Sequence, residues 1–159
     1  ARRGIRIGYE ALAWGRHVFR FDQAMNVVER ANHPNLGIIL DSFQTLVRPE
    51  QWSDIADLRG NRIFFLQLGD AVRKDSDPLT IRRQHSRLPG QGDLDVASFL
   101  RAVLATGYSG NLSIEIFNEQ TTEPPKATAR AGMSSLLKVE EQARRGEERG
   151  RPDPTIGAP

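Results

Sequence analysis

The chain has 159 residues, and its 22 lysine and arginine residues nearly balance its 20 acidic residues, so its charge gives no reason to expect nucleic acid as a partner. It has no cysteine, which excludes disulfides, thiolate catalysis and cysteine-ligated metal sites and favours oxygen ligands for any metal. No apolar run approaches the roughly 20 residues of a membrane span, and the first residues lack a signal-peptide hydrophobic region, so we expect a cytoplasmic protein.

The predicted elements alternate between short apolar strands and amphipathic helices. A strand at residues 5–9 precedes a loop and a helix that we expect to be capped by Asp22 and ended by Pro34. Residues 36–40 form an apolar run without alternation, which is typical of a strand buried on both faces in a parallel sheet. A loop and a short helix at residues 51–58 follow this strand.

The second part of the chain repeats the alternation. A third strand at residues 62–67 leads into the longest loop candidate, residues 69–92, and connections of that length are usually functional or mobile. A helix capped by Asp95 and closed by Gly107 then precedes a fourth strand at residues 111–117. We expect the last helix to bury four apolar residues, Met133, Leu136, Leu137 and Val139.

Four βα units correspond to half of an eight-stranded βα barrel, which typically needs about 250 residues. An open doubly wound sheet fits the alternation almost as well, but oxygen-bearing side chains at four successive strand ends favour the barrel, in which all strand ends point at one axis. We therefore predict an α/β fold in which residues 1–145 form the C-terminal half of a (β/α)8 TIM barrel and residues 146–159 form a disordered tail or linker. The absence of an initial methionine suggests a piece of a longer chain.

The four strand-end residues are Glu10, Asp41, Gln67 and Glu115. The carboxyl ends of parallel strands are where α/β folds bind ligands. Three carboxylates and an amide oxygen directed at one point would repel one another, and a hard divalent cation is the usual reason to assemble them. Taken singly, Glu10 could be a solvated residue and Gln67 a loop hydrogen-bonding residue. The metal site is therefore predicted from the coincidence of all four.

Five segments of the chain resemble one family: residues 9–17 (YEALAWGRH), 40–43 (LDSF), 65–70 (FLQLGD), 89–94 (PGQGDL) and 113–118 (SIEIFN). Together they resemble the second half of a sugar phosphate isomerase/epimerase-like TIM barrel of the xylose-isomerase-like type. Within it they are most similar to bacterial metal-dependent 3-dehydroshikimate dehydratases, some of which are fused to a 4-hydroxyphenylpyruvate dioxygenase-like domain. The resemblance implies that Glu10, Asp41, Gln67 and Glu115 bind a divalent cation (Mg²⁺, Mn²⁺ or Co²⁺).

The position of Gln44 departs from what the resemblance leads us to expect, which is a histidine that contacts substrate or transfers a proton. Glutamine cannot serve as a general base near neutral pH, although it can hold a hydroxyl group by hydrogen bonding. Gln44, His17 and His85 are therefore the candidate catalytic residues, the two histidines as alternative bases.

Residues 81–87 also differ in order from the expected family pattern. An arginine in this segment suits a carboxylate-bearing substrate, because a guanidinium can donate two parallel hydrogen bonds. We select Arg83 first and Arg87 second, and we add Trp14 as a further candidate for substrate binding.

The resemblance implies a lyase that dehydrates 3-dehydroshikimate to protocatechuate through a metal-stabilised enolate. Isomerisation or epimerisation of a keto-sugar or its phosphate is an alternative, because it begins with the same proton removal. A third possibility is an inactive fragment or subunit, since four strands leave two sheet edges unpaired. A homodimer or a complementing barrel half would close them. The expected ligand is a hydroxy-keto acid or a sugar, and neither nucleic acid nor membrane is expected as a partner.

Overall fold

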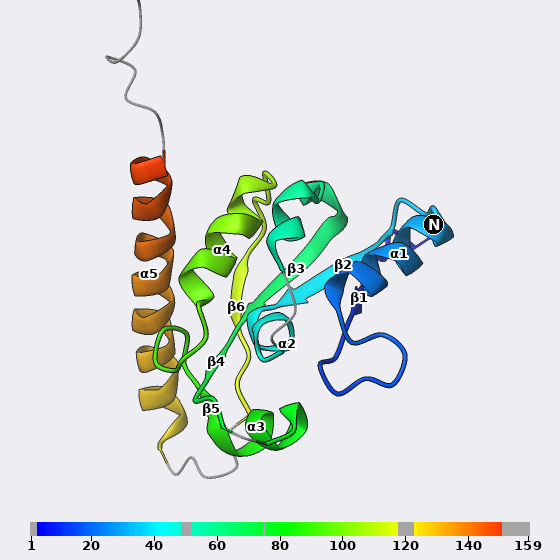
Figure 1. Cartoon of the computed structure of the whole chain (residues 1–159). Coiled ribbons are helices and arrows are strands. Elements are labelled where there is room, and N and C mark those ends of the chain that lie inside the picture. Colours follow the sequence, from blue (N-terminus) through cyan, green and yellow to red (C-terminus); the bar gives the residue numbers. More distant parts are fainter. Residues whose placement is uncertain (1–2, 49–51, 75, 118–122, 151–159) are drawn as a thin grey trace, which may run out of the picture.

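The four parallel strands of the sheet follow one another in chain order (Figure 1). The computed structural model describes residues 3–48, 52–74, 76–117 and 123–150. All neighbouring strands of this sheet are parallel. Their order is β1 (Ile7–Glu10), β2 (Leu36–Asp41), β3 (Ile63–Leu68) and β6 (Leu112–Ile114). A doubly wound sheet reverses its strand order at a switch point, whereas a barrel does not. The observed order is that of a barrel segment.

Helices and short helical turns connect the strands, and the core lies between them and the sheet. The connecting elements are α1 (Phe21–Ala31), α2 (Ser42–Leu46), the 3₁₀ turns η1 (Ser53–Asp57) and η2 (Gly60–Arg62), and α4 (Val96–Ala105); α5 (Pro125–Gly150) ends the described chain. Strand residues Ile38 and Leu66 are fully buried, as are Val28 of α1 and Phe99 of α4. Within the described residues, no helix has both the length and the apolar character needed to cross a membrane.

Helix α4 forms as its sequence predicts. Asp95 is the N-cap, and its carboxylate accepts a hydrogen bond from the Ser98 amide at 3.1 Å. Gly107 lies just beyond the C-cap with φ of 82°, a left-handed conformation that favours glycine. Helix α1 differs in its cap, since Arg20 occupies the N-cap and Asp22 lies in the first turn, where it pairs with Arg20.

The prediction of a loop at residues 69–92 is wrong. This segment contains a two-stranded antiparallel ladder of β4 (Asp70–Ala71) and β5 (Ser86–Arg87), with α3 (Pro78–His85) between them. Asp77 caps α3 by accepting from the amides of Leu79 and Thr80, and Pro78 sits in the first turn, where proline is favoured. The Asp-Pro pair was the local signal for this helix.

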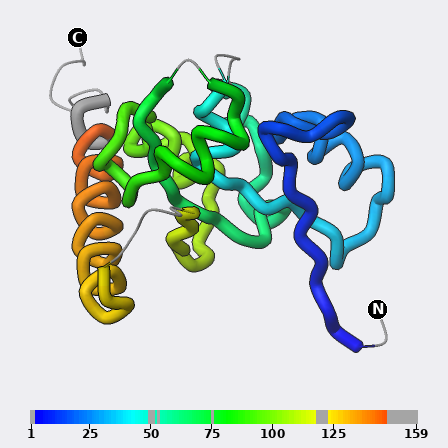
Figure 2. Tube along the Cα trace, turned by 90° about the horizontal axis from the view of Figure 1, so that it is seen from below, coloured from blue at the N-terminus to red at the C-terminus, as the bar shows by residue number. Residues whose placement is uncertain are grey.

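Helix α5 packs against α4 and lies at the opposite side of the molecule from the N-terminal strand (Figures 1 and 2). Its buried side uses Leu136, Val139 and Ala143. The prediction was wrong for Met133 and Leu137, which are 57% and 55% exposed. The helix also continues to Gly150, past the expected start of the tail at residue 146, and residues 151–159 lie outside the described residues.

Two further elements differ from expectation near the second strand. The helix expected at residues 51–58 is the 3₁₀ turn η1, which begins at Ser53. Helix α2 was not expected; it begins directly after β2 because the Asp41 carboxylate accepts a hydrogen bond from the Gln44 amide and so caps it. The strand boundaries differ from the predicted ones by at most three residues, and the second strand begins at Leu36 as predicted.

Candidate metal centre

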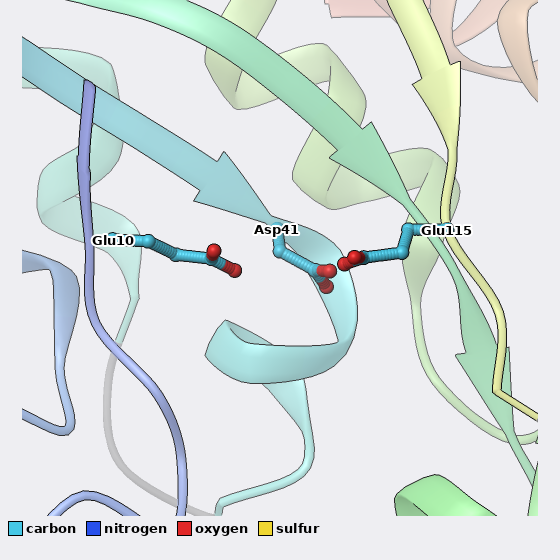
Figure 3. A group of neighbouring side chains, drawn as sticks. All are labelled: Glu10, Asp41 and Glu115. Atoms are coloured by element: carbon cyan, nitrogen blue, oxygen red, sulfur yellow. The ribbon is translucent and has the colours of Figure 1, made fainter. Parts of the chain in front are cut away.

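Three carboxylates meet at the carboxyl end of the sheet (Figure 3). Glu10 ends β1, Asp41 ends β2 and Glu115 directly follows β6. Each offers an oxygen atom that lies within 4.8 Å of the oxygens of the other two. The convergence expected from the strand ends is therefore present for these three residues, which we call the carboxylate cluster.

Strand register places Gln67 beside this cluster. Asp41 and Gln67 are partners across β2 and β3, and Gln67 is in turn the partner of Ser113 in β6. Partners in adjacent parallel strands point to the same face of a sheet, so Gln67 shares the face of Asp41. The ladder continues beyond β6, since the Glu115 amide donates to the Leu68 carbonyl at 3.1 Å.

The cluster is unevenly buried: the Glu115 side chain is 30% exposed, whereas Asp41 is enclosed. Asp41 is 1% exposed, and burial raises the pKa of its carboxyl group, with the neighbouring Glu115 adding to the effect. Burial, and then the charge of Glu115, raises the pKa of Glu10 to about 7. Glu10 Oε1 is buried without a hydrogen-bond partner among the described residues. Buried acceptors are normally satisfied, so this atom calls for a cation or a proton.

Arg82 is the charged partner of the cluster, and it was missed by sequence reasoning. Its side chain is 1% exposed, and Nη2 donates to Asp41 Oδ2 at 3.2 Å and to Glu115 Oε2 at 2.7 Å. The guanidinium carbon lies 4.8 Å from the ring centroid of Phe43 and 4.9 Å from that of Phe117. Both distances are within the range of cation–π attraction.

The donor set fits a hard divalent cation. Three carboxylates and one amide oxygen are ligands that such ions prefer, and the unpartnered Glu10 Oε1 is an acceptor that the fold itself leaves unsatisfied. Residues Glu10, Asp41, Gln67 and Glu115 would hold the ion, as the strand ends predict. Their role as ligands stays a prediction.

Comparison with known proteins gives a consistent result. The model of the xylose isomerase-like TIM barrel family matches residues 1–139. The chain belongs to this family. It is 51% identical to a 3-dehydroshikimate dehydratase of Pseudomonas putida over 144 residues, which are 90% of this chain and 23% of that protein. It is 27% identical to an inosose isomerase of Bacillus licheniformis over 128 residues, which are 75% of this chain and 45% of that protein.

A solved structure agrees with the fold. A xylose isomerase-like TIM barrel/4-hydroxyphenylpyruvate dioxygenase fusion protein superposes with a TM-score of 0.88 at 47% identity, over 98% of this chain and 25% of that chain. The chain thus spans about a quarter of the dehydratase and of the fusion protein, and under half of the inosose isomerase. The resemblance and the partial α/β barrel predicted from sequence are confirmed.

In the present chain, Gln44 forms a hydrogen bond with the backbone of the loop that follows β1. Its Oε1 accepts a hydrogen bond from the Ala13 amide at 2.8 Å, and Arg48 Nε donates to the Ala13 carbonyl at 2.7 Å. Both backbone groups of Ala13 are therefore fixed by side chains. Trp14, the next residue, is half-buried and packs against the core. The direct contact of Gln44 with substrate stays a prediction, as does that of Trp14.

The two candidate histidines lie in different settings. His17 is exposed in the loop between β1 and α1. His85 is half-buried at the last position of α3, three residues after Arg82. Residues three apart share a helix face, so His85 is on the side of α3 that reaches the cluster.

The arginine that meets the carboxylates is neither of those selected from sequence. Arg83 is exposed on α3. Arg87 is half-buried, and its Nη1 donates a hydrogen bond to the Ser86 carbonyl at 2.8 Å. Together with Leu88 and Gln91 it lines a separate cavity of about 260 Å³. Sequence alone identified the basic segment but not which side chain turns inward, because that depends on the orientation of an unexpected helix.

Proposed function

We propose that this chain is part of a divalent-metal-dependent lyase that dehydrates 3-dehydroshikimate to protocatechuate. The observation that carries the proposal is the convergence of Glu10, Asp41 and Glu115 at one point in a chain that is 51% identical to a 3-dehydroshikimate dehydratase. A bound divalent cation would supply Lewis-acid stabilisation for the negative charge that develops as a proton leaves the carbon next to a ketone.

The protein's own groups would supply orientation and proton transfer. The carboxylate cluster and Gln67 fix the position at which a ketone and its neighbouring hydroxyl are held. Gln44 is not a base, and its carbonyl oxygen is already used by Ala13, so the proton must go elsewhere. Between the two histidines we favour His85, because it shares a face of α3 with Arg82.

An isomerase or epimerase of a keto-sugar is the second candidate. It is supported by the 27% identity to the inosose isomerase, and the same cluster suits both reactions. We rank the lyase first because the match to the dehydratase has the higher identity and covers more of this chain.

The exposed edge of the sheet supports the proposal that this chain has a partner. Ile7 lies in the edge strand β1 and Ile5 lies just before it, and their exposed fractions are 60% and 61%. We propose that a complementing barrel half, or a second copy of the chain, covers this edge, and that the isolated chain turns over little substrate. The cytoplasmic location stays a prediction.

The test uses this chain alone and combined with a segment that supplies the first four βα units of a homologous barrel. Each sample receives Mn²⁺, Mg²⁺ or Co²⁺ with 3-dehydroshikimate, and protocatechuate absorbance is followed. Product should form in the combined sample and disappear in Glu115→Gln but not in Glu29→Gln, an exposed matched control. His85→Asn and His17→Asn rank the two bases. Absence of product in every combination, with turnover of an inosose instead, would favour the isomerase.

A further inference from the structure

Arg82 adds a permanent positive charge to the carboxylate cluster. We propose that Arg82 is a resident counter-cation of the candidate metal centre: it holds Asp41 and Glu115 together before a divalent cation binds, and it weakens the binding of that cation. This inference rests on the metal site proposed above, and it assigns to Arg82 a positioning role.

The charges of the described groups support this role. With the three carboxylates ionised, as metal ligation would require, their charges sum to −3, and the Arg82 guanidinium brings the total to −2. A divalent cation would then make the partly buried site neutral. Without Arg82 the same site would carry −3 before the ion binds, and this larger negative charge would attract a divalent cation more strongly.

The Arg82 side chain is enclosed by its surroundings, and among the described residues only Nη2 of its guanidinium has hydrogen-bond partners. Its guanidinium carbon is close to the ring centroids of both Phe43 and Phe117, at 4.8 and 4.9 Å, and the Ser86 hydroxyl donates to the Arg82 backbone carbonyl at 2.5 Å. A Cβ added at Gly69 would come within 3.2 Å of Arg82 Nη1 and 2.5 Å of the Glu115 carbonyl oxygen. The absence of a side chain at residue 69 therefore leaves space for the guanidinium beside the cluster.

Two opposite effects on the site follow from this geometry. In the metal-free chain, Nη2 bridges Asp41 Oδ2 and Glu115 Oε2 and offsets the repulsion between these two carboxylates. The same guanidinium would repel an incoming cation. Its hydrogen bonds also occupy carboxylate oxygens that the cation needs as ligands. Glu10 has no hydrogen bond to Arg82 among the described contacts, so it offers the cation a carboxylate free of this competition.

The test compares the full chain with Arg82→Met, which removes the charge, with Arg82→Lys, which keeps it, and with Arg130→Met, at an exposed position of α5, as the matched control. Mn²⁺ affinity is measured by calorimetry, and metal-free stability by urea unfolding in EDTA. We expect Arg82→Met to bind Mn²⁺ at least about tenfold more tightly. We also expect it to shift the metal-free unfolding equilibrium toward the unfolded state by on the order of a hundredfold, as for a broken buried ion pair. Arg82→Lys should lie closer to the wild type in affinity, and Arg130→Met should match the wild type.

A double variant covers the case in which Arg82→Met does not fold without metal. Arg82→Met/Glu115→Gln returns the cluster to the wild-type charge of −2 and should recover most of the lost metal-free stability; no recovery would overturn the proposal. Mn²⁺ affinity in Arg82→Met that is equal to or weaker than wild type also overturns it. If neither protein binds Mn²⁺, Mg²⁺ or Co²⁺, the metal site itself fails, and the proposed function fails with it.

Discussion

Asp41 and Asp70 are buried aspartates beside the ends of neighbouring strands, yet their surroundings are opposite. Asp70 is 0% exposed, and its carboxylate accepts hydrogen bonds from the amides of Ala71, Gly92 and Leu94 at 2.7, 2.8 and 3.0 Å. Asp41 accepts from one backbone amide, that of Gln44, and otherwise faces Arg82 and the two further carboxylates that Figure 3 shows beside it.

The difference is the one expected between a structural carboxylate and a candidate metal ligand. Backbone amides replace the lost water around Asp70, so this charge joins β4 to the segment that precedes α4. At Asp41 the loss of water is only partly compensated by Arg82 and the Gln44 amide, and the raised pKa of its carboxyl group reflects this incomplete compensation. Perturbed pKa values with a specific charge partner are typical of functional sites.

The largest expected effect concerns metal binding. Asp41→Asn should lose Mn²⁺ binding altogether, because an amide replaces the most buried carboxylate of the cluster, whereas Asp70→Asn should keep the affinity of its folded fraction within a factor of a few. Calorimetry with Mn²⁺ on both proteins checks this. Equal losses in the two variants would show that Asp41 has no special role.

Stability should show the reverse order. Asp70→Asn is expected to lower the free energy of unfolding by about 3 kcal/mol, because charge-assisted hydrogen bonds to three amides are weakened or lost. Asp41→Asn should cost about 1 kcal/mol or less in the metal-free chain, since it also removes repulsion within the cluster. Urea unfolding in EDTA measures both, and a larger loss for Asp41→Asn would contradict the comparison.

The close packing between the two regions gives the third prediction. Gly69→Ala should cost about 1–3 kcal/mol, as overpacking usually does, because its Cβ would meet the Glu115 carbonyl oxygen at 2.5 Å. Gly132→Ala is the matched control in α5. Its Cβ would meet only Ile114 and Leu88 side chains at 3.0 and 3.6 Å, so the helix should gain up to about 0.5 kcal/mol. Equal losses in urea would remove the argument for a site-specific fit at residue 69.

The strand ends could be predicted because their chemistry is local. An apolar run that stops at Glu10, Asp41 or Glu115 shows both the strand and the edge at which it ends. Arg82 could not be selected over Arg83, because its direction depends on how α3 docks and not on its neighbours in sequence. Met133 and Leu137 were misplaced for a related reason: α5 carries apolar residues on two sides, and only its contact with α4 decides which is buried.

The fourth prediction concerns pH in the metal-free chain. The pKa of Glu10 is raised from 4.5 to about 7, so its contribution to stability is fully present below pH 4.5 and is lost as the pH rises through about 7. Stability should therefore fall over this window, and less steeply in Glu10→Gln. Urea unfolding between pH 4.5 and 8 measures both slopes, and identical slopes would rule out Glu10 as the titrating group.

The smallest effect sets the baseline for these comparisons. Met133→Gln and Leu137→Gln should each change the free energy of unfolding by less than about 0.5 kcal/mol, because both side chains are more than half exposed on α5. The same change at Leu136, which is 9% exposed, should be clearly larger. Thermal unfolding of the three variants is sufficient, and a large loss at residue 133 or 137 would reveal a contact that the described chain does not contain.

The reciprocal hydrogen bonds between Ser42 and Gly69 bear on the fidelity of folding. The Ser42 hydroxyl donates to the Gly69 carbonyl at 2.6 Å and accepts from the Gly69 amide at 2.9 Å, which ties the end of β2 to the end of β3. A slip of one residue between these strands would break both bonds and would bring Leu66 or Leu68, instead of Gln67, beside Asp41. A chain that pairs its strands wrongly would therefore lack the complete set of oxygen ligands, and uptake of a metal ion would select the correctly paired molecules.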